Sequence, residues 1–100
     1  MLTPQQFATI NGLAYQAAVT RLCAGFELDN VKYAKAVNAI VNSGNDKLSD
    51  ELKAERQANI LITLGTSYGL FLAEGAEKKD AFCAGAGVAR KDNEVSHLWE

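Results

Sequence analysis

The residues best suited to chemistry in this chain are its two cysteines and its one histidine. The strongest enzymatic hypothesis makes Cys83 a nucleophile and His97 its general base. Three features oppose it. No third group that would orient the base can be identified, Cys83 falls in the middle of a predicted helix, and His97 stands near the end of the sequence. We therefore predict that the chain is not an enzyme and has no catalytic residue.

The same residue types form a poor set of ligands for a metal. Two cysteines and one histidine lack the C-x-x-C and H-x-x-x-H spacings of zinc sites. Asp92, Glu94 and His97 stand close together, but short polar tails contain such groups by chance. The string at residues 85–90, GAGVAR, begins like a dinucleotide-binding fingerprint but lacks its third glycine and a preceding strand. We expect neither a metal nor a cofactor.

The cysteines instead favour a disulfide. Cys23 ends the first predicted helix and Cys83 lies in the fourth, and the first and last helices of an up-down bundle are commonly adjacent. A Cys23–Cys83 bridge would stabilise the fold by about 4 kcal/mol. It would also imply an oxidising compartment, so that the protein is periplasmic or secreted. The alternative is a cytoplasmic protein with two buried free thiols.

The helices that must position these residues are predicted from apolar periodicity and from end signals. Thr3, Asp29 and Ser49 are predicted N-cap residues, and Gly25 is a left-handed stop for the first helix. No segment alternates with period two for long enough to indicate a sheet. We predict that residues 1–100 form a single all-α domain, a small four-helix bundle-like fold with one disulfide between its first and fourth helices.

The third predicted helix carries the most apolar stretch of the chain. Residues 60–73 are apolar nearly all round, which predicts a central helix packed by neighbours on several sides. Gly75 is predicted to break or bend the chain before a fourth helix at residues 76–91.

Candidate interface residues are the small residues on one side of the third helix and the single tryptophan: Ala58, Gly65, Gly69 and Trp99. A glycine inside a helix costs about 1 kcal/mol relative to alanine, so close approach of another helix is the expected compensation. That helix belongs either to this chain or to a second copy in a homodimer. Trp99 either caps the bundle or anchors a partner. Val95 and Leu98 precede it at helical spacing and predict a last turn docked on the core.

Composition argues against two classes of partner. Apolar residues make up 48% of the chain and charged residues 22%, which is typical of a globular protein. Ten basic and twelve acidic side chains are interspersed and give a net charge of −2, so no basic stripe is available for a nucleic acid. Residues 57–73 carry no charge but are too few and too polar to predict a membrane span.

The resulting leading hypothesis is a small non-enzymatic, exported bacterial accessory protein that acts by protein–protein interaction, with another protein or with itself. No signal peptide is present in the sequence as written, and removal of a leader stays open. Two alternatives remain. One is a cytosolic or phage-encoded binding or inhibitor module with reduced cysteines. The other is a helical bundle that binds a small ligand between its helices.

Overall fold

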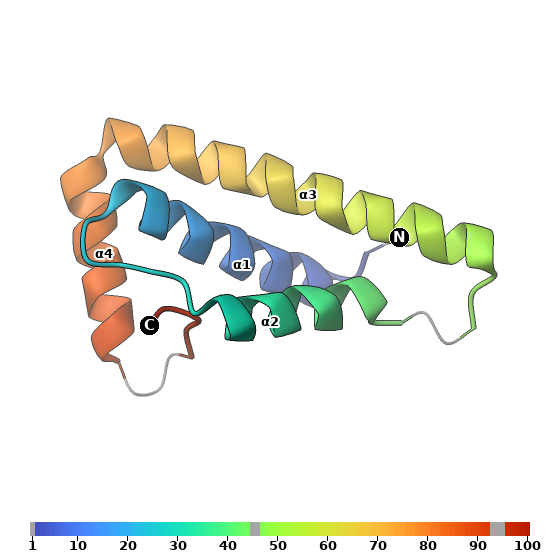
Figure 1. Ribbon diagram of the computed structural model, residues 1–100. Helices are drawn as coiled ribbons and strands as arrows, with labels where there is room; N and C mark the ends of the chain where they lie inside the picture. The colour runs from blue at the N-terminus through green and yellow to red at the C-terminus, as the bar shows by residue number, and fades with distance from the viewer. Residues whose placement is uncertain (1, 45–46, 93–95) are drawn as a thin grey trace.

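The computed structural model describes residues 2–44, 47–92 and 96–100, and this part of the chain forms four helices. They are α1 (Pro4–Leu22), α2 (Asn30–Asn42), α3 (Asp50–Glu77) and α4 (Lys79–Lys91). Helices α1, α2 and α3 lie side by side along the length of the molecule, and α4 runs across one end of them (Figure 1). The prediction of an all-helical fold is confirmed. Within the described ranges, no helix has both the length and the apolar character needed to cross a membrane.

The helix ends follow from local hydrogen bonds that the sequence predicts. Thr3 Oγ1 accepts a hydrogen bond from the backbone N–H of Gln6, and Gln6 Oε1 accepts one from the backbone N–H of Thr3, which is a capping box. The side chains of Asp29 and Ser49 cap α2 and α3 by accepting a hydrogen bond from the backbone N–H of Lys32 and of Leu52, respectively. Gly25, with φ of 83°, lies in the left-handed region just after α1. All four of these predictions are confirmed.

Helix α1 is the most enclosed element, because it contributes to both apolar clusters of the core. The first cluster, which we call the disulfide-end cluster, consists of Val19, Cys23, Phe26, Ala86 and Trp99. The second lies among α1, α2 and α3 and consists of Ile10, Leu13, Ile40 and Ile60. The central helix of this domain is therefore α1 and not α3.

The prediction that residues 60–73 are surrounded on several sides is wrong. Ile60 is fully buried, but Leu61 is 52% exposed and Ile62 is 66% exposed. The physical reason is that α1, α2 and α4 all lie to one side of α3, as Figure 1 shows. An apolar residue can thus stand on either face of this helix, and its composition does not reveal which face is covered.

The prediction for Gly75 is also wrong. Helix α3 continues through Gly75, which is buried, and ends at Glu77. The chain leaves the helix at Lys78, whose backbone has φ of −127° and ψ of 52°, so α4 begins at Lys79. A Cβ added to Gly75 would stand only 2.7 Å from Leu22 Cδ1. Gly75 therefore makes room for packing and does not provide a turn.

The C-terminal residues pair as extended chain. The backbone N–H of Asp29 donates to the carbonyl oxygen of Leu98 at 2.8 Å. Leu28 and Trp99 form an isolated antiparallel bridge. The predicted last helical turn is wrong for residues 96–100, which are not helical, and Val95 lies outside the described residues. The backbone N–H and C=O groups just before α2 have no partner within a helix, and pairing with the C-terminal residues provides their hydrogen bonds.

Candidate functional site

A disulfide joins the end of α1 to α4. The sulfur atoms of Cys23 and Cys83 are bonded at 2.07 Å, and the two Cα atoms are 5.6 Å apart. The predicted bridge is confirmed. Cys83 consequently has no thiol with which to act as a nucleophile. The ring of His97 lies 5.3 Å from that of Trp99, and its Nδ1 accepts a hydrogen bond from the Trp99 backbone N–H.

Trp99 closes the disulfide-end cluster. Its side chain is 3% exposed, and its ring makes an edge-to-face contact with Phe26 at 5.0 Å between centroids. Its indole N–H donates to the backbone carbonyl of Gln16 at 3.0 Å. Of the two predicted roles, the structure places Trp99 in the capping position. As an anchor for a partner it offers almost no accessible surface in this chain.

Exposed apolar and small residues gather along one side of α3. We call this surface the outer face of α3, and it carries Ala58, Leu61, Ile62, Gly65, Gly69 and Ala73. All six residues are exposed, and the other three helices lie to one side of α3 (Figure 1). Leu61 and Ile62 are the bulkiest of the six. Large apolar residues that gather on one exposed face are typical of a contact surface.

Gly65 and Gly69 fall in the middle of this outer face. A Cβ added to either glycine would meet no atom within 4 Å. No helix of this chain therefore approaches closely enough to require the two glycines. The expectation of close packing inside the chain is wrong, whereas the homodimer seam stays a prediction.

The other motifs of the sequence assemble no site within the part of the chain that the structure describes. Among the described residues, no group of three or more His, Cys, Asp or Glu side chains is placed to hold a metal ion. Of the three groups considered as ligands, Glu94 lies outside the described residues. The glycine-rich string at residues 85–90 lies within α4, and its Ala86 is fully buried in the disulfide-end cluster. Ala86 is thus the small residue of this string that packing encloses, whereas a Cβ added to Gly85 or Gly87 would meet no atom within 4 Å.

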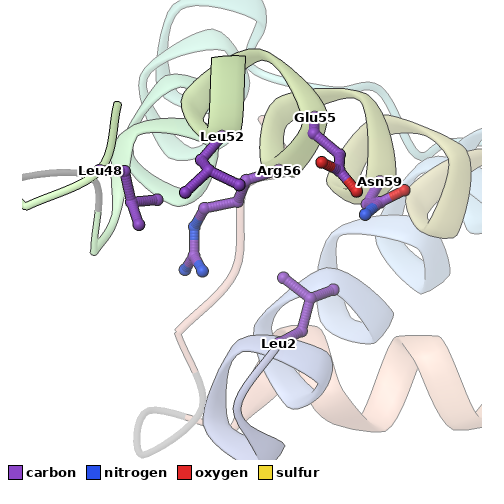
Figure 2. Close-up of a pocket in the computed structure, with 6 residues that line it drawn as sticks. All are labelled: Leu2, Leu48, Leu52, Glu55, Arg56 and Asn59. Carbon is purple, nitrogen blue, oxygen red and sulfur yellow. The ribbon is translucent and has the colours of Figure 1, made fainter. Parts of the chain in front are cut away.

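A pocket opens between the N-terminal ends of α1 and α3. It encloses about 190 Å³, which is small for a ligand site. Its lining, drawn in Figure 2, consists of Leu2, Leu48, Leu52, Glu55, Arg56 and Asn59. Glu55 and Asn59 lie together on one side of it, Arg56 lies on the other, and Leu2 faces them from across the pocket. The pocket thus combines an apolar floor with two separated charges of opposite sign.

The guanidinium of Arg56 is held in place by the loop that follows α2. Its Nε donates to the carbonyl oxygen of Ser43 at 3.0 Å. The Ser43 hydroxyl in turn accepts from Gln6 Nε2 at 3.0 Å and donates to the carbonyl oxygen of Ile40 at 2.8 Å. Gly44, with φ of 72°, lies against the guanidinium, and a Cβ there would stand 3.0 Å from Nη2. This network fixes Arg56 while it leaves Nη1 and Nη2 without a hydrogen bond to the described residues.

Sequence reasoning missed Arg56 and its pocket. One signal was present, since Arg56 and Leu52 stand one turn apart in the half-polar start of the third predicted helix. The contact that orients Arg56 comes from a loop 13 positions earlier in the chain, and helical periodicity carries no information about it.

Two tyrosines, Tyr15 and Tyr33, have raised pKa values. The hydroxyl of Tyr33 donates to the carbonyl oxygen of Leu13 at 2.8 Å and ties α2 to α1. Burial raises the pKa of Tyr33, and the nearby Tyr68 raises it further. Burial alone raises the pKa of Tyr15. Tyr33 therefore remains a neutral hydrogen-bond donor throughout the physiological range.

Comparisons with protein-family models, with curated proteins and with solved structures each gave no match.

Proposed function

We propose that this chain is a small non-enzymatic, exported accessory protein that acts by protein–protein interaction through the outer face of α3. The observation that carries the proposal is the exposure of Leu61 and Ile62 beside two helical glycines with open space above them. Each glycine costs the isolated helix about 1 kcal/mol. A helix packed from outside would compensate that cost, because it can approach closely only where side chains are missing.

The first partner we propose is a second copy of the chain. The outer face carries both large and small residues, so the outer faces of two copies can pack against each other. Consider two α3 helices crossing in antiparallel fashion about a two-fold axis between Gly65 and Gly69. Ile62 of each copy then lies at the level of Leu72 of the other. Apolar side chains would therefore meet apolar side chains in this arrangement.

Export is the second part of the proposal, and the Cys23–Cys83 bridge supports it. Structural disulfides persist in oxidising compartments and are rare in the reducing cytosol. Purification under non-reducing conditions, followed by thiol alkylation and intact mass, tests this part. We expect an unalkylated monomeric chain that is lighter by about two hydrogens than its reduced form. Two alkylated cysteines would instead favour the cytosolic module.

The interaction itself is tested by the molar mass in solution, measured by light scattering across a dilution series. We expect the unaltered chain to dimerise, and we expect Ile62→Glu and Gly69→Leu to be monomeric at every concentration. Both variants should fold normally, since Ile62 is two-thirds exposed and the space at Gly69 is open. Val31→Glu is the matched control, because Val31 is 65% exposed on α2, away from the outer face of α3.

Two results would overturn self-association through this face. One is an unaltered chain that stays monomeric at the highest concentration. The other is a dimer that Ile62→Glu leaves intact or that Val31→Glu disrupts equally. If the chain is monomeric and a defined partner is later identified whose binding neither Ile62→Glu nor Gly69→Leu changes, the outer face has no role in interaction at all.

A further inference from the structure

We propose that the pocket between the ends of α1 and α3 binds a small apolar α-amino acid as its zwitterion. This inference goes beyond the proposed function and is independent of it, because no residue of the outer face of α3 lines the pocket. It starts from Arg56, the only cation among the six lining residues.

The guanidinium of Arg56 is positioned to receive a carboxylate. Its Nε is already used by Ser43, and this contact leaves the Nη1 and Nη2 edge with no hydrogen bond to the described residues. Two parallel N–H donors in a fixed plane match the two oxygens of a carboxylate. The hydrogen bonds around Ser43 order the Arg56 side chain before a ligand binds, which lowers the conformational entropy lost on binding.

The remaining lining residues match the other parts of an amino acid. Glu55, on the side opposite Arg56, is exposed and makes no ion pair within the described chain, so its carboxylate can accept the ammonium group. Asn59 lies beside it and supplies a further carbonyl oxygen. Three leucines remain for the apolar side chain: Leu2, Leu48 and Leu52.

Size and charge exclude the neighbouring ligand classes. A volume of about 190 Å³ is below the usual range of drug-sized ligand pockets, which starts at about 300 Å³. A dianion such as phosphate would face repulsion from Glu55 and would gain nothing from the leucines. A neutral apolar molecule would leave both charges of the pocket unused. An apolar zwitterion satisfies the leucines and both charges together.

The test uses three probes of nearly the same shape: L-leucine, 4-methylpentanoate, which lacks the ammonium group, and 3-methylbutylamine, which lacks the carboxylate. Each is titrated into the ¹⁵N-labelled full chain while amide shifts are followed by NMR. We expect saturable shifts at Leu48, Leu52 and Asn59 with leucine. Loss of either charged group should weaken binding about tenfold or more, as for one charge-assisted hydrogen bond. Amides around Gly12 and Ser96, which line a separate apolar depression, report non-specific binding.

Variants then assign the two charges. Glu55→Gln should weaken leucine about tenfold and leave 4-methylpentanoate unchanged or tighter. Glu51→Gln is the matched control, since Glu51 lies one turn earlier on α3 and does not line the pocket. Arg56→Gln should abolish binding of both carboxylates. Because Arg56 also anchors Ser43, its variant is read only after the fold is checked by its amide spectrum.

Three results would overturn the proposal. The first is the absence of saturable shifts with leucine at tens of millimolar. The second is equal affinity for all three probes, which would mean apolar binding without recognition of charge. The third is unchanged leucine affinity in Glu55→Gln, with 4-methylpentanoate binding as well as leucine, which would reduce the site to a binder of simple carboxylates.

Discussion

Helix α3 contains three glycines, and their surroundings differ: one is enclosed by other side chains and two are open. Gly75 is buried, and a Cβ there would stand 2.7 Å from Leu22 Cδ1 and 3.0 Å from Phe82 Cδ2. Gly65 and Gly69 stand on the outer face, where a Cβ would meet nothing within 4 Å. All three weaken the helix by a similar amount relative to alanine. Packing within the chain compensates for this loss of helix stability at Gly75, but not at Gly65 or Gly69.

This difference separates residues that build the fold from residues that only a partner would require. The end of α3 near Gly75 is filled from within, by the disulfide-end cluster and the half-buried side chains around it. The outer face, on the opposite side of the same helix, has no such filling. A glycine of this kind lowers helix stability and makes no contact in the chain that compensates for it. Replacing it should therefore make the monomer more stable and weaken binding to a partner.

The largest expected effect concerns the disulfide, which lies at the end of α3 near Gly75. Replacing both cysteines, as in Cys23→Ser with Cys83→Ser, removes a cross-link between residues 60 positions apart. The chain-entropy model predicts a loss of about 4 kcal/mol in the free energy of unfolding. Urea unfolding of the oxidised chain and of the double variant measures it. A loss below about 1 kcal/mol would mean that packing alone holds α4 in place.

The second effect tests whether Gly75 is required by packing. Gly75→Ala forces Leu22 or Phe82 to move, and overpacking of this kind typically costs about 1–3 kcal/mol. The gain in helix propensity offsets about 1 kcal/mol of that cost. We expect a net loss of up to about 2 kcal/mol in the free energy of unfolding, measured by the same experiment. An unchanged or more stable variant would show that Leu22 yields freely and would break the contrast with the outer glycines.

The third effect has the opposite sign. In Gly69→Ala the new methyl group meets open space, so helix propensity should stabilise the chain by about 0.5–1 kcal/mol. The unfolding experiment is done in the Ile62→Glu background, in which self-association should be absent. Destabilisation there would mean that the outer face is covered within the chain. Gly65→Ala serves as the internal replicate, since its surroundings are equally open.

The sequence predicted what depends on neighbouring residues. The caps at Thr3, Asp29 and Ser49 each use a hydrogen bond across three positions, so they can be recognised locally. Gly25 was recognised as a stop because the apolar pattern ends beside it. The Cys23–Cys83 pairing was predicted because the chain offers no other pair of cysteines.

The sequence did not predict what depends on the neighbours of a helix. Gly65 and Gly75 look alike along the chain, and only the positions of α1 and α4 show that one is open and the other enclosed. The same holds for the pocket at Arg56, whose orientation comes from the loop at Ser43. The buried role of Trp99 was one of two alternatives, and its antiparallel pairing with Leu28 could not be deduced from a helical spacing.

The smallest expected effect concerns the C-terminal residues next to Trp99, which close the disulfide-end cluster. The backbone N–H of Glu100 donates to the carbonyl oxygen of Glu27 at 2.8 Å, which brings the two side chains together. A hydrogen bond shared with the Glu27 carboxylate raises the pKa of Glu100, and the negative charges of Glu27 and Asp29 raise it further. Between the unfolded and folded pKa values, the folded state binds more protons than the unfolded state. Stability contributed by this group is therefore present at low pH and is lost as the pH rises through the folded pKa.

Glu100→Gln removes this titration, because glutamine can still hydrogen-bond to Glu27 but carries no charge. We expect the variant to be slightly more stable than the unaltered chain above the raised pKa, and no more stable below it. Because Glu100 is exposed, salt should shrink the difference. Thermal melting at several pH values, at low and high salt, measures both trends. If the variant is instead less stable at neutral pH, the Glu27 and Glu100 carboxylates do not approach each other in solution.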